Sequence, residues 1–466
     1  MASLKQTESL STAEGTFDLC WSEHALGEQK CLRLKVKLAR SFSAIPLLKN
    51  ASDWAFAWRG RDDGFLTLAL DALLVISEAD RMLMGRDSVL QWFGGQTFYT
   101  EGAPEWGDLR RGLWFLPAVT WKLADDQSIL IIQSLGSGDA IRQDMKARLS
   151  SLLEEAFGTE AYPEIAPGVI ERTDIPSRSG WRSSLESAKK GFKDGLFSKV
   201  VMSRMSQLKL DREDSWLFWL EKLLEYREES YIFAIKSPDG HAFLGRSPER
   251  LLAWKEGVFQ VDAIAGTRKR GASTESDQSA SKELQLSQKD LIEHRYVSQY
   301  VSNLLKSLSL HFEVVDDERI LQLRHVQHLR TRFQGQLTQS CDALELLKYL
   351  HPTPAVGGLP TAEAMEFIRQ HEVSSRGWYA GYIGWCSQSS GECAIGIRSA
   401  LVYRDSIQVF AGAGIVQDSD IDAEWEETEL KMQNFLRLID SAPSSALMPK
   451  TETNELDLRR SSRADP

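Results

Sequence analysis

Apolar residues follow both of the periodicities that regular secondary structure imposes. Residues 199–210 alternate between apolar and polar, which predicts a β-strand. Two apolar runs, residues 251–254 and 258–261, flank the polar residues 255–257, as in a β-hairpin with Gly near its turn. Residues 290–308 instead repeat apolar positions every three to four residues, which predicts a long helix. Hairpins with intervening helices indicate an α+β fold with large antiparallel sheets.

The same patterns predict further elements on both sides of this region. The expected strands are residues 128–132 and a second hairpin of residues 394–404 and 406–415. The expected helices are residues 139–156, 181–195, 361–370 and 422–439, the last capped by Asp422.

Four segments lack a regular pattern. Residues 351–360, HPTPAVGGLP, contain too much Pro and Gly for a helix or a central strand, so they predict a close-packed loop. The polar residues 1–15 are expected to be frayed. The Ser- and Gly-rich residues 271–282 predict a mobile loop, and the Ser-rich, charged residues 442–466 predict a disordered tail.

Composition narrows the class of protein. The 466 residues are 42% hydrophobic, which suffices for a sizeable core. The net charge of −11 argues against a general nucleic-acid binder but leaves room for a small anion, which needs only a few local cations. Five scattered cysteines indicate reduced thiols in a cytoplasmic protein. The N-terminus resembles no signal peptide, and the most apolar run, residues 66–76, is too short to span a membrane.

One carboxylate lies in a position suited to acid catalysis. Glu249 follows Pro248 and precedes the apolar run at residues 251–254, so it is expected where a strand begins. A carboxyl group that is partly buried there can have a raised pKa and act as a general acid. The alternative from the hairpin alone is an exposed Glu paired with Arg250.

The last predicted helix carries three charged residues on one face. Glu424, Glu427 and Lys431 are separated by three and four positions. They form either a solvated face with an ordinary ion pair between Glu427 and Lys431, or a carboxylate pair for a hard cation beside a lysine for an anion. Periodicity alone favours the solvated face.

Nine motifs together resemble those of the chorismate-utilising enzymes, in the order that the family has them. They are KVVMSR, GRSPERLL, AIAGTRKRG, KDLIEHRYV, HPTPAVGGLP, RGWYAGYIGW, IGIRSALV, FAGAGIV and EWEETELK. The resemblance covers about residues 190–440. Within the family it is strongest to isochorismate synthases of the menaquinone or phylloquinone type, because of HPTPAVGGLP and the lysine at position 199.

The resemblance implies a fold and a division of the chain. The expected fold is α+β, a large two-layer antiparallel β-sandwich flanked by helices, with the site in a cleft between the layers. Residues 190–441 form the chorismate-binding catalytic region. Residues 1–189 are expected to add strands and helices to the same body.

The resemblance also implies roles for eleven residues. Lys199 matches the general base that activates water, and Glu249 matches the general acid. The carboxylates that match the Mg²⁺ site are Glu293, Glu427 and, as an additional acidic position, Glu424. The positions that match the substrate pocket are Thr267, Ala355, Tyr382, Arg398, Gly412 and Lys431, of which Arg398 and Lys431 are cations for substrate carboxylates.

These roles form a consistent reaction. Isochorismate arises when water adds to C2 of chorismate and the C4 hydroxyl leaves, so one group must accept a proton and another must donate one. The overall reaction is an isomerisation. It requires an uncharged Lys199 and a protonated Glu249, and Mg²⁺ suits the all-oxygen carboxylate site.

Other chemistries on the same scaffold remain alternatives. A salicylate synthase performs the same first step and then eliminates pyruvate, and a siderophore-pathway isochorismate synthase differs only in its pathway. An ammonia-using enzyme would need an amidotransferase subunit, whereas Lys199 favours water and so no such subunit. A silent chorismate-binding protein would have lost Lys199 or Glu249. The expected protein is a monomer or homodimer that binds chorismate, with no nucleic-acid or membrane partner.

Overall fold

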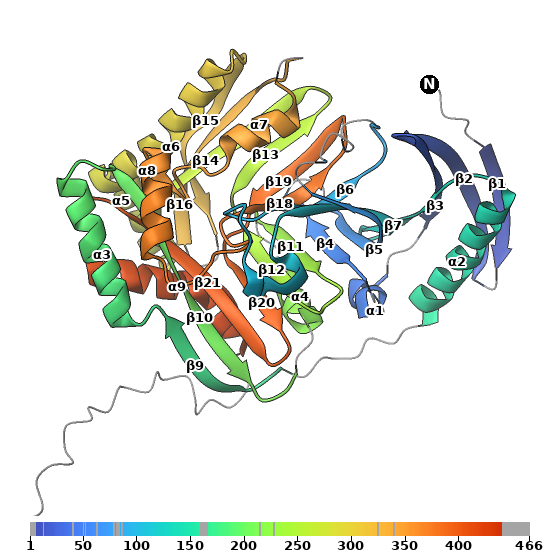
Figure 1. Cartoon of the computed structure of the whole chain (residues 1–466), viewed down its shortest axis with the longest axis horizontal. Helices are drawn as coiled ribbons and strands as arrows, with labels where there is room; N and C mark the ends of the chain where they lie inside the picture. The colour runs from blue at the N-terminus through green and yellow to red at the C-terminus, as the bar shows by residue number, and fades with distance from the viewer. Residues whose placement is uncertain are drawn as a thin grey trace, which may run out of the picture.

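A computed structural model of the chain shows one extended antiparallel sheet with helices packed on it (Figure 1). The structure describes residues 6–12, 14–39, 42–49, 51, 53–61, 64–77, 80, 84, 87–158, 166–213, 216–226, 229–323, 326–338 and 341–439. The predicted tail, residues 442–466, lies outside the described residues. None of the helices in the described part combines the length and apolar character that spanning a bilayer requires.

The sheet branches at the central strand β7 (Leu113–Leu123). One edge of β7 continues, in order of pairing, through β5 (Leu66–Ile76), β4 (Ala55–Arg59), β11 (Tyr231–Lys236), β12 (Ala242–Ser247), β20 (Ser399–Tyr403), β21 (Ser406–Ile415), β10 (Lys199–Leu210) and β9 (Val169–Ile175). We call this series the first branch.

Two further series leave the other edge of β7, on either side of Pro117, which has no N–H to donate. The second branch comprises β6 (Trp92–Gln96), β18 (Tyr382–Cys386), β19 (Ser390–Ile395), β13 (Arg250–Lys255), β14 (Val258–Lys269), β16 (Val326–Gln336) and β15 (Phe312–Gln322). The third comprises β8 (Ser128–Leu135), β3 (Gln29–Leu38), β2 (Gly15–Leu26) and β1 (Gln6–Thr12).

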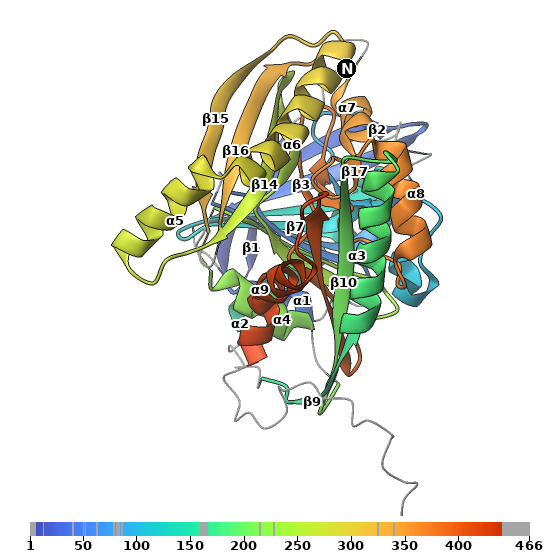
Figure 2. The ribbon, with the colours of Figure 1, turned by 90° about the vertical axis from the view of Figure 1, so that its left-hand side faces the viewer.

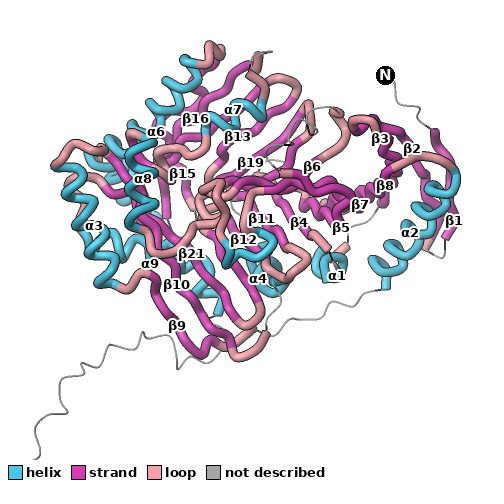
Figure 3. The backbone as a smooth tube through the Cα atoms, viewed as in Figure 1, coloured by secondary structure: helices cyan, strands magenta, loops and turns pink. Residues whose placement is uncertain are grey.

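The helices lie on the outside of these strands, as the cyan segments of Figure 3 show. In the described part they are α1 (Ala44–Lys49), α2 (Asp139–Gly158), α3 (Arg178–Lys193), α4 (Trp216–Leu224), α5 (Thr274–Leu286), α6 (Gln288–Ser307), α7 (Ala343–Leu350), α8 (Thr361–His371) and α9 (Ile421–Ile439), with a 3₁₀ segment at Pro104–Leu109. Figure 2 shows the side where α6 packs against β14 and β16, and where α9 packs against β21.

Most predicted elements are confirmed. Strand β10 begins at Lys199, and helix α6 covers the predicted 290–308 helix with two extra residues at its start. In the β13–β14 hairpin, Glu256 and Gly257 both have positive φ, at 51° and 87°, which is the backbone of a type I′ turn. The tryptophans fill the core, and nine of them are less than 2% exposed.

Three local predictions are wrong. Of the predicted loop at residues 271–282, residues 274–282 belong to α5, because Ser273 caps this helix through a capping box with Ser276, and Leu284 is fully buried on it. Of the N-terminal residues expected to be frayed, residues 6–12 form β1 and pair with β2. The last helix is capped by Asp420, whose carboxylate accepts the N–H of Ala423, and not by Asp422.

A smaller difference concerns the Pro-rich loop and the second hairpin. Gly358–Leu359 forms a two-residue strand, β17, that pairs with Lys199 and Val200 of β10. The predicted 394–404 strand is divided between β19 and β20, because Arg398 has a positive φ of 52° and interrupts it.

A buried ionic cluster connects helix α9 to strand β10. Arg204 of β10 is fully buried and bonds Glu429 and Thr428 of α9 and Asp174 of β9. Its guanidinium lies 3.7 Å from the ring centroid of Trp425. Because a buried guanidinium requires this complete set of partners, the cluster fixes how α9 lies along the first branch.

We expect Arg204→Met to lower the free energy of unfolding by about 3 kcal/mol, since the change leaves the partly buried carboxylates of Asp174 and Glu429 with Arg172 as their remaining cation. Urea denaturation followed by tryptophan fluorescence measures this loss. The control is Lys209→Met, which breaks an exposed pair with Asp405 at 3.9 Å and should change stability by less than about 1 kcal/mol. Equal effects of the two variants would show that the cluster does not fix α9.

Candidate active site

A cavity lies between the ends of the first and second branches. Strands β10 and β21 line it from the first branch, β14 and β16 from the second, and helices α6 and α9 complete it. Nine of the eleven residues predicted from the sequence line this cavity: Lys199, Glu249, Thr267, Glu293, Ala355, Arg398, Gly412, Glu427 and Lys431. Tyr382 and Glu424 do not.

Lys199 is the first residue of β10 and is 1% exposed. Its Nζ lies 3.2 Å from Oε1 of Glu293, which α6 carries into the cavity. Gly414 of β21 makes this contact possible, because a Cβ at that position would lie 2.6 Å from Glu293 Oε1 and 3.1 Å from Lys199 Cε. The amine therefore reaches the cavity beside a carboxylate.

Glu249 lies between β12 and β13 and is 4% exposed. Its surroundings exclude the alternative of an exposed Glu paired with Arg250, since Arg250 instead bonds Tyr231, Gln260 and Glu392. Burial raises the pKa of Glu249 to about 8, although the charges of Lys199 and Lys431 oppose the shift. At neutral pH the carboxyl group is consequently protonated and can donate a proton.

Helix α9 carries a lysine and a carboxylate into the cavity. Lys431 Nζ lies 2.7 Å from Glu427 Oε1 and donates to the carbonyl of Gly412 at 2.8 Å. Burial raises the pKa of Glu427, but Lys431, Lys289 and Arg398 together outweigh this effect, and the net result is a lowered pKa. Glu427 is therefore a carboxylate at neutral pH.

Glu424 lies one turn earlier on α9, next to the cavity but not in its wall. It is 3% exposed, and its carboxylate pairs with Lys289 of α6 at 3.3 Å. Burial raises the pKa of Glu424, and the negative charge of Glu427 raises it further. An additional cation between these carboxylates would relieve their repulsion.

Sequence analysis missed His328 of β16, which lies in the cavity wall beside Arg398. Its Nδ1 lies 3.1 Å from the carbonyl of Gly266 and 3.1 Å from Oγ1 of Thr267, so Nδ1 carries the proton. Its Nε2 then accepts from Arg398 at 3.4 Å. Burial and the charges of Arg398 and Lys431 lower the pKa of His328 to about 3. The feature of the sequence that could have identified His328 is a polar residue within a buried strand.

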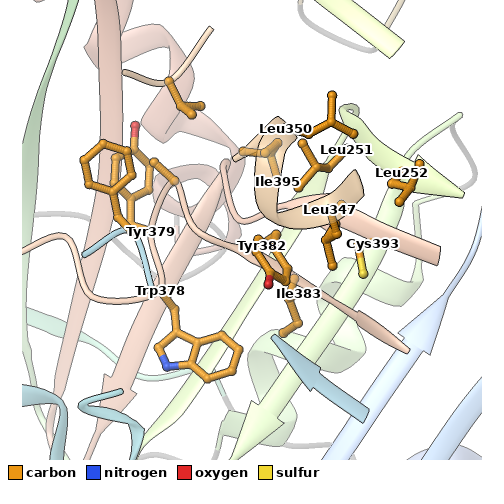
Figure 4. Close-up of a cluster of buried hydrophobic side chains, with 14 of the residues drawn as sticks. Leu251, Leu252, Leu347, Leu350, Trp378, Tyr379, Tyr382, Ile383, Cys393 and Ile395 are labelled. Atoms are coloured by element: carbon orange, nitrogen blue, oxygen red, sulfur yellow. The ribbon is translucent and has the colours of Figure 1, made fainter. Parts of the chain in front are cut away.

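The motif RGWYAGYIGW contains two tyrosines, and the structure places the other one in the cavity. Tyr382, the predicted pocket residue, lies among hydrophobic side chains of the core (Figure 4). Its ring packs against that of His351. Tyr379 lines the cavity, and a Cβ on Gly412 would lie 2.8 Å from its hydroxyl. Spacing along the motif did not distinguish them, because Ala380 has a positive φ of 59° and redirects the chain.

The cavity thus combines three chemical abilities. An amine and a protonated carboxyl group can accept and donate protons on one substrate. Arg398 and Lys431 supply positive charge for an anionic substrate within a protein of net charge −11. Glu293 and Glu427 offer carboxylate oxygens, the ligands that hard cations prefer.

Comparison with known sequences places the chain in one family. Residues 72–440 match the family model described as "Chorismate binding enzyme". The chain is 35% identical over 351 residues to isochorismate synthase MenF of Bacillus subtilis, covering 74% of this chain and 73% of that protein. It is 31% identical over 379 residues to the chloroplastic isochorismate synthase 2 of Arabidopsis thaliana, covering 79% of this chain and 67% of that protein.

Solved structures of other proteins superimpose on this fold. The structure of MenF, described as the menaquinone-specific isochorismate synthase from Escherichia coli, superimposes with a TM-score of 0.78 at 25% identity, covering 90% of this chain and 96% of that one. Anthranilate synthase component I from Streptococcus pneumoniae has a TM-score of 0.67 at 20% identity and shares the fold. The antiparallel α+β fold expected from the sequence is confirmed, and the chain belongs to the chorismate binding enzyme family.

Proposed function

We propose that the protein is an isochorismate synthase, an isomerase that adds water at C2 of chorismate and releases the C4 hydroxyl. The observation that carries this proposal is that Lys199 and the buried Glu249 line the same cavity, where the pKa of Glu249 is about 8. The similarity to MenF proteins supports a role in menaquinone or phylloquinone synthesis.

In this reaction, Lys199 acts as the base. The step requires the amine in its uncharged form, which accepts a proton from water as the oxygen of that water bonds to C2. Glu249 donates its proton to the departing C4 oxygen, the C4–O bond breaks, and the ring double bonds shift. The product has the composition of the substrate, and solvent returns the protons, so no redox partner or amidotransferase subunit is required.

The cationic and small residues of the cavity hold the substrate. Arg398 and Lys431 bind the two carboxylates of chorismate, while Thr267, Ala355 and Gly412 form the remaining contacts. His328 helps to hold Arg398, since its neutral ring can accept a hydrogen bond from the guanidinium without adding positive charge. Tyr379 takes the pocket position that the sequence assigned to Tyr382.

The residues also fit a Mg²⁺ ion. Glu293 and Glu427 line the same cavity, and the nearby Glu424 is a buried carboxyl group whose pKa is raised by burial and by Glu427. Mg²⁺ usually retains several waters or substrate oxygens among its ligands, so a small number of protein carboxylates is enough to hold it. When bound, the ion supplies Lewis-acid polarisation and charge neutralisation at a substrate carboxylate.

Purified protein incubated with chorismate and Mg²⁺ should form isochorismate, as measured by liquid chromatography, and added ammonium should not change the product. Salicylate with pyruvate would indicate a salicylate synthase, and an aminated product would contradict Lys199 as the base that activates water. No turnover with chorismate still bound would contradict the proposed enzyme.

Glu249→Gln and Lys199→Ala should each lower kcat by about 10²–10⁴-fold, because each removes one of the two proton-transfer groups. The control for the first variant is Glu256→Gln, which makes the same change at the exposed turn of the same hairpin and should leave kcat unchanged. Near-normal turnover of Glu249→Gln would exclude Glu249 as the acid.

The value of kcat/KM should decrease as the pH rises above about 8. Glu249 works in its protonated form, and its raised pKa of about 8 means that this form is lost above that pH. Initial rates between about pH 6 and 10 test this, with the fold monitored by circular dichroism at each pH. A profile that stays flat through pH 10 would contradict a titrating acid in the free enzyme.

Chelation should abolish turnover and added Mg²⁺ should restore it. Glu427→Gln should raise the Mg²⁺ dissociation constant, measured by isothermal titration calorimetry, by about 100-fold or more, since outer contacts to a metal already contribute 10–100-fold. The control is Glu426→Gln on the same helix, because the Glu426 side chain is 65% exposed and pairs with Arg178. Unchanged Mg²⁺ affinity in Glu427→Gln would contradict the proposed ligand.

A further inference from the structure

Hydrogen bonds of the backbone and of the Arg250 side chain hold the segment around Glu249. The N–H of Glu249 donates to Oγ of Ser247 at 3.2 Å, and the carbonyl of Glu249 accepts the N–H of Ile395 at 3.0 Å. Arg250 bonds the hydroxyl of Tyr231 at 2.7 Å. The remaining group, the carbonyl of Pro248 immediately before Glu249, accepts a hydrogen bond from a distant part of the chain.

Arg61 provides that hydrogen bond. Its Nη1 donates to the carbonyl of Pro248 at 2.9 Å, and its Nη2 lies 2.7 Å from Oδ2 of Asp262. The side chain is 2% exposed, and its guanidinium lies 5.0 Å from the ring centroid of Tyr231. Arg61 follows β4 and precedes the residues 72–440 that match the family model, so the family comparison assigns it no role.

Asp262 of β14 gives the arginine a fixed, ionised partner. Its side chain is fully buried between Arg61 and Arg332 of β16, whose Nε lies 2.9 Å from Oδ1. Burial alone would raise the pKa of Asp262, but Arg61, Arg332 and Arg250 together outweigh burial and lower it. Asp262 therefore carries a negative charge, and this charge raises the pKa of Glu249.

We propose that Arg61 is a positioning residue for Glu249: by bridging Asp262 and the Pro248 carbonyl, it fixes the direction from which the acid enters the cavity. The inference rests on the proposed function, because it assumes that Glu249 is the proton donor. A planar guanidinium can donate to two acceptors in fixed relative directions, which a single ammonium group cannot do.

The charged groups acting on Glu249 come from several elements. Lys199 of β10 and Lys431 of α9 favour its carboxylate form, whereas Asp262 of β14 favours its protonated form. Arg61 and Arg332 act through Asp262, because they keep it ionised. Asp262 thus counteracts the effect of the two cavity lysines on the pKa of Glu249. Arg61 positions Glu249 relative to these three charged groups.

Arg332 provides a matched control, because it pairs with Asp262 as Arg61 does. It lies on β16, directly opposite Asp262 in the β14–β16 pairing, and its Nε and Nη2 both donate to the Asp262 carboxylate. Arg61→Met and Arg332→Met each remove one guanidinium from Asp262, but only the first also frees the Pro248 carbonyl. The comparison separates positioning from general stability.

The experiment measures kcat and KM for isochorismate formation, with thermal unfolding of every variant. We expect Arg61→Met to lower kcat by about 10–100-fold with KM within about threefold, since a small displacement of a catalytic group has that effect. Arg332→Met should keep kcat within about threefold of the unmodified protein. Arg61→Lys should retain the unfolding temperature but recover only part of kcat.

A second arm uses the pH profile, which a purely structural role would not change. Asp262→Asn should move the alkaline decline of kcat/KM to lower pH, because removing a negative neighbour lowers the pKa of Glu249. This arm and Arg61→Lys also decide the question if Arg61→Met fails to fold.

Three results would overturn the inference: unchanged kcat in Arg61→Met or in Arg61→Lys, an equal loss of kcat in Arg332→Met, or an unchanged pH profile in Asp262→Asn. Failure of the proposed function itself looks different. In that case the unmodified protein forms no isochorismate, or Glu249→Gln retains its activity.

Discussion

Desolvation of charged side chains between two branches of one sheet is the constraint on which the site depends. Glu249 is buried where those branches approach each other, and burial is the largest influence on its pKa. A value of about 8 against the ordinary 4.5 persists even though two lysines oppose it. Removing water thus outweighs the local positive charge, and this makes a glutamate a proton donor at neutral pH.

The same constraint explains how the other charges are arranged. In the cavity, Lys199 lies beside Glu293, and Lys431 lies beside Glu427, so each cation has a carboxylate within 3.2 Å. Outside the lining of the cavity, Arg61 and Arg332 both pair with Asp262. A buried charge without a partner would cost several kcal/mol, so these charged side chains are buried as ion pairs.

Each pair joins elements that lie far apart in the sequence. Lys199 is on β10 and Glu293 on α6, and their contact needs β21 between them with glycine at position 414. The cluster around Arg204 holds α9 against β10 and so determines where Glu427 and Lys431 enter the cavity. Catalytic geometry in this protein therefore depends on sheet order and on how the helices pack against it.

Local sequence determined many of the elements. The alternation that starts at Lys199 marked β10, and the Lys-Glu-Gly turn marked the β13–β14 hairpin, because both patterns depend on neighbouring residues alone. The motifs that resemble the chorismate-utilising enzymes predicted nine residues that share one cavity. The helix at residues 274–286 was missed because its Ser-rich start is typical of a loop until the burial of Leu284 is known.

The sequence by itself determined the strand and helix patterns, the candidate acid and base, and the acidic and basic residues that could serve them. Only the tertiary structure decided that Tyr379 and not Tyr382 lines the cavity, that His328 contacts Arg398, and that Arg61 reaches Pro248. The physical reason is that burial, pKa and hydrogen-bond partners arise from contacts across the sheet, which no local pattern of residues records.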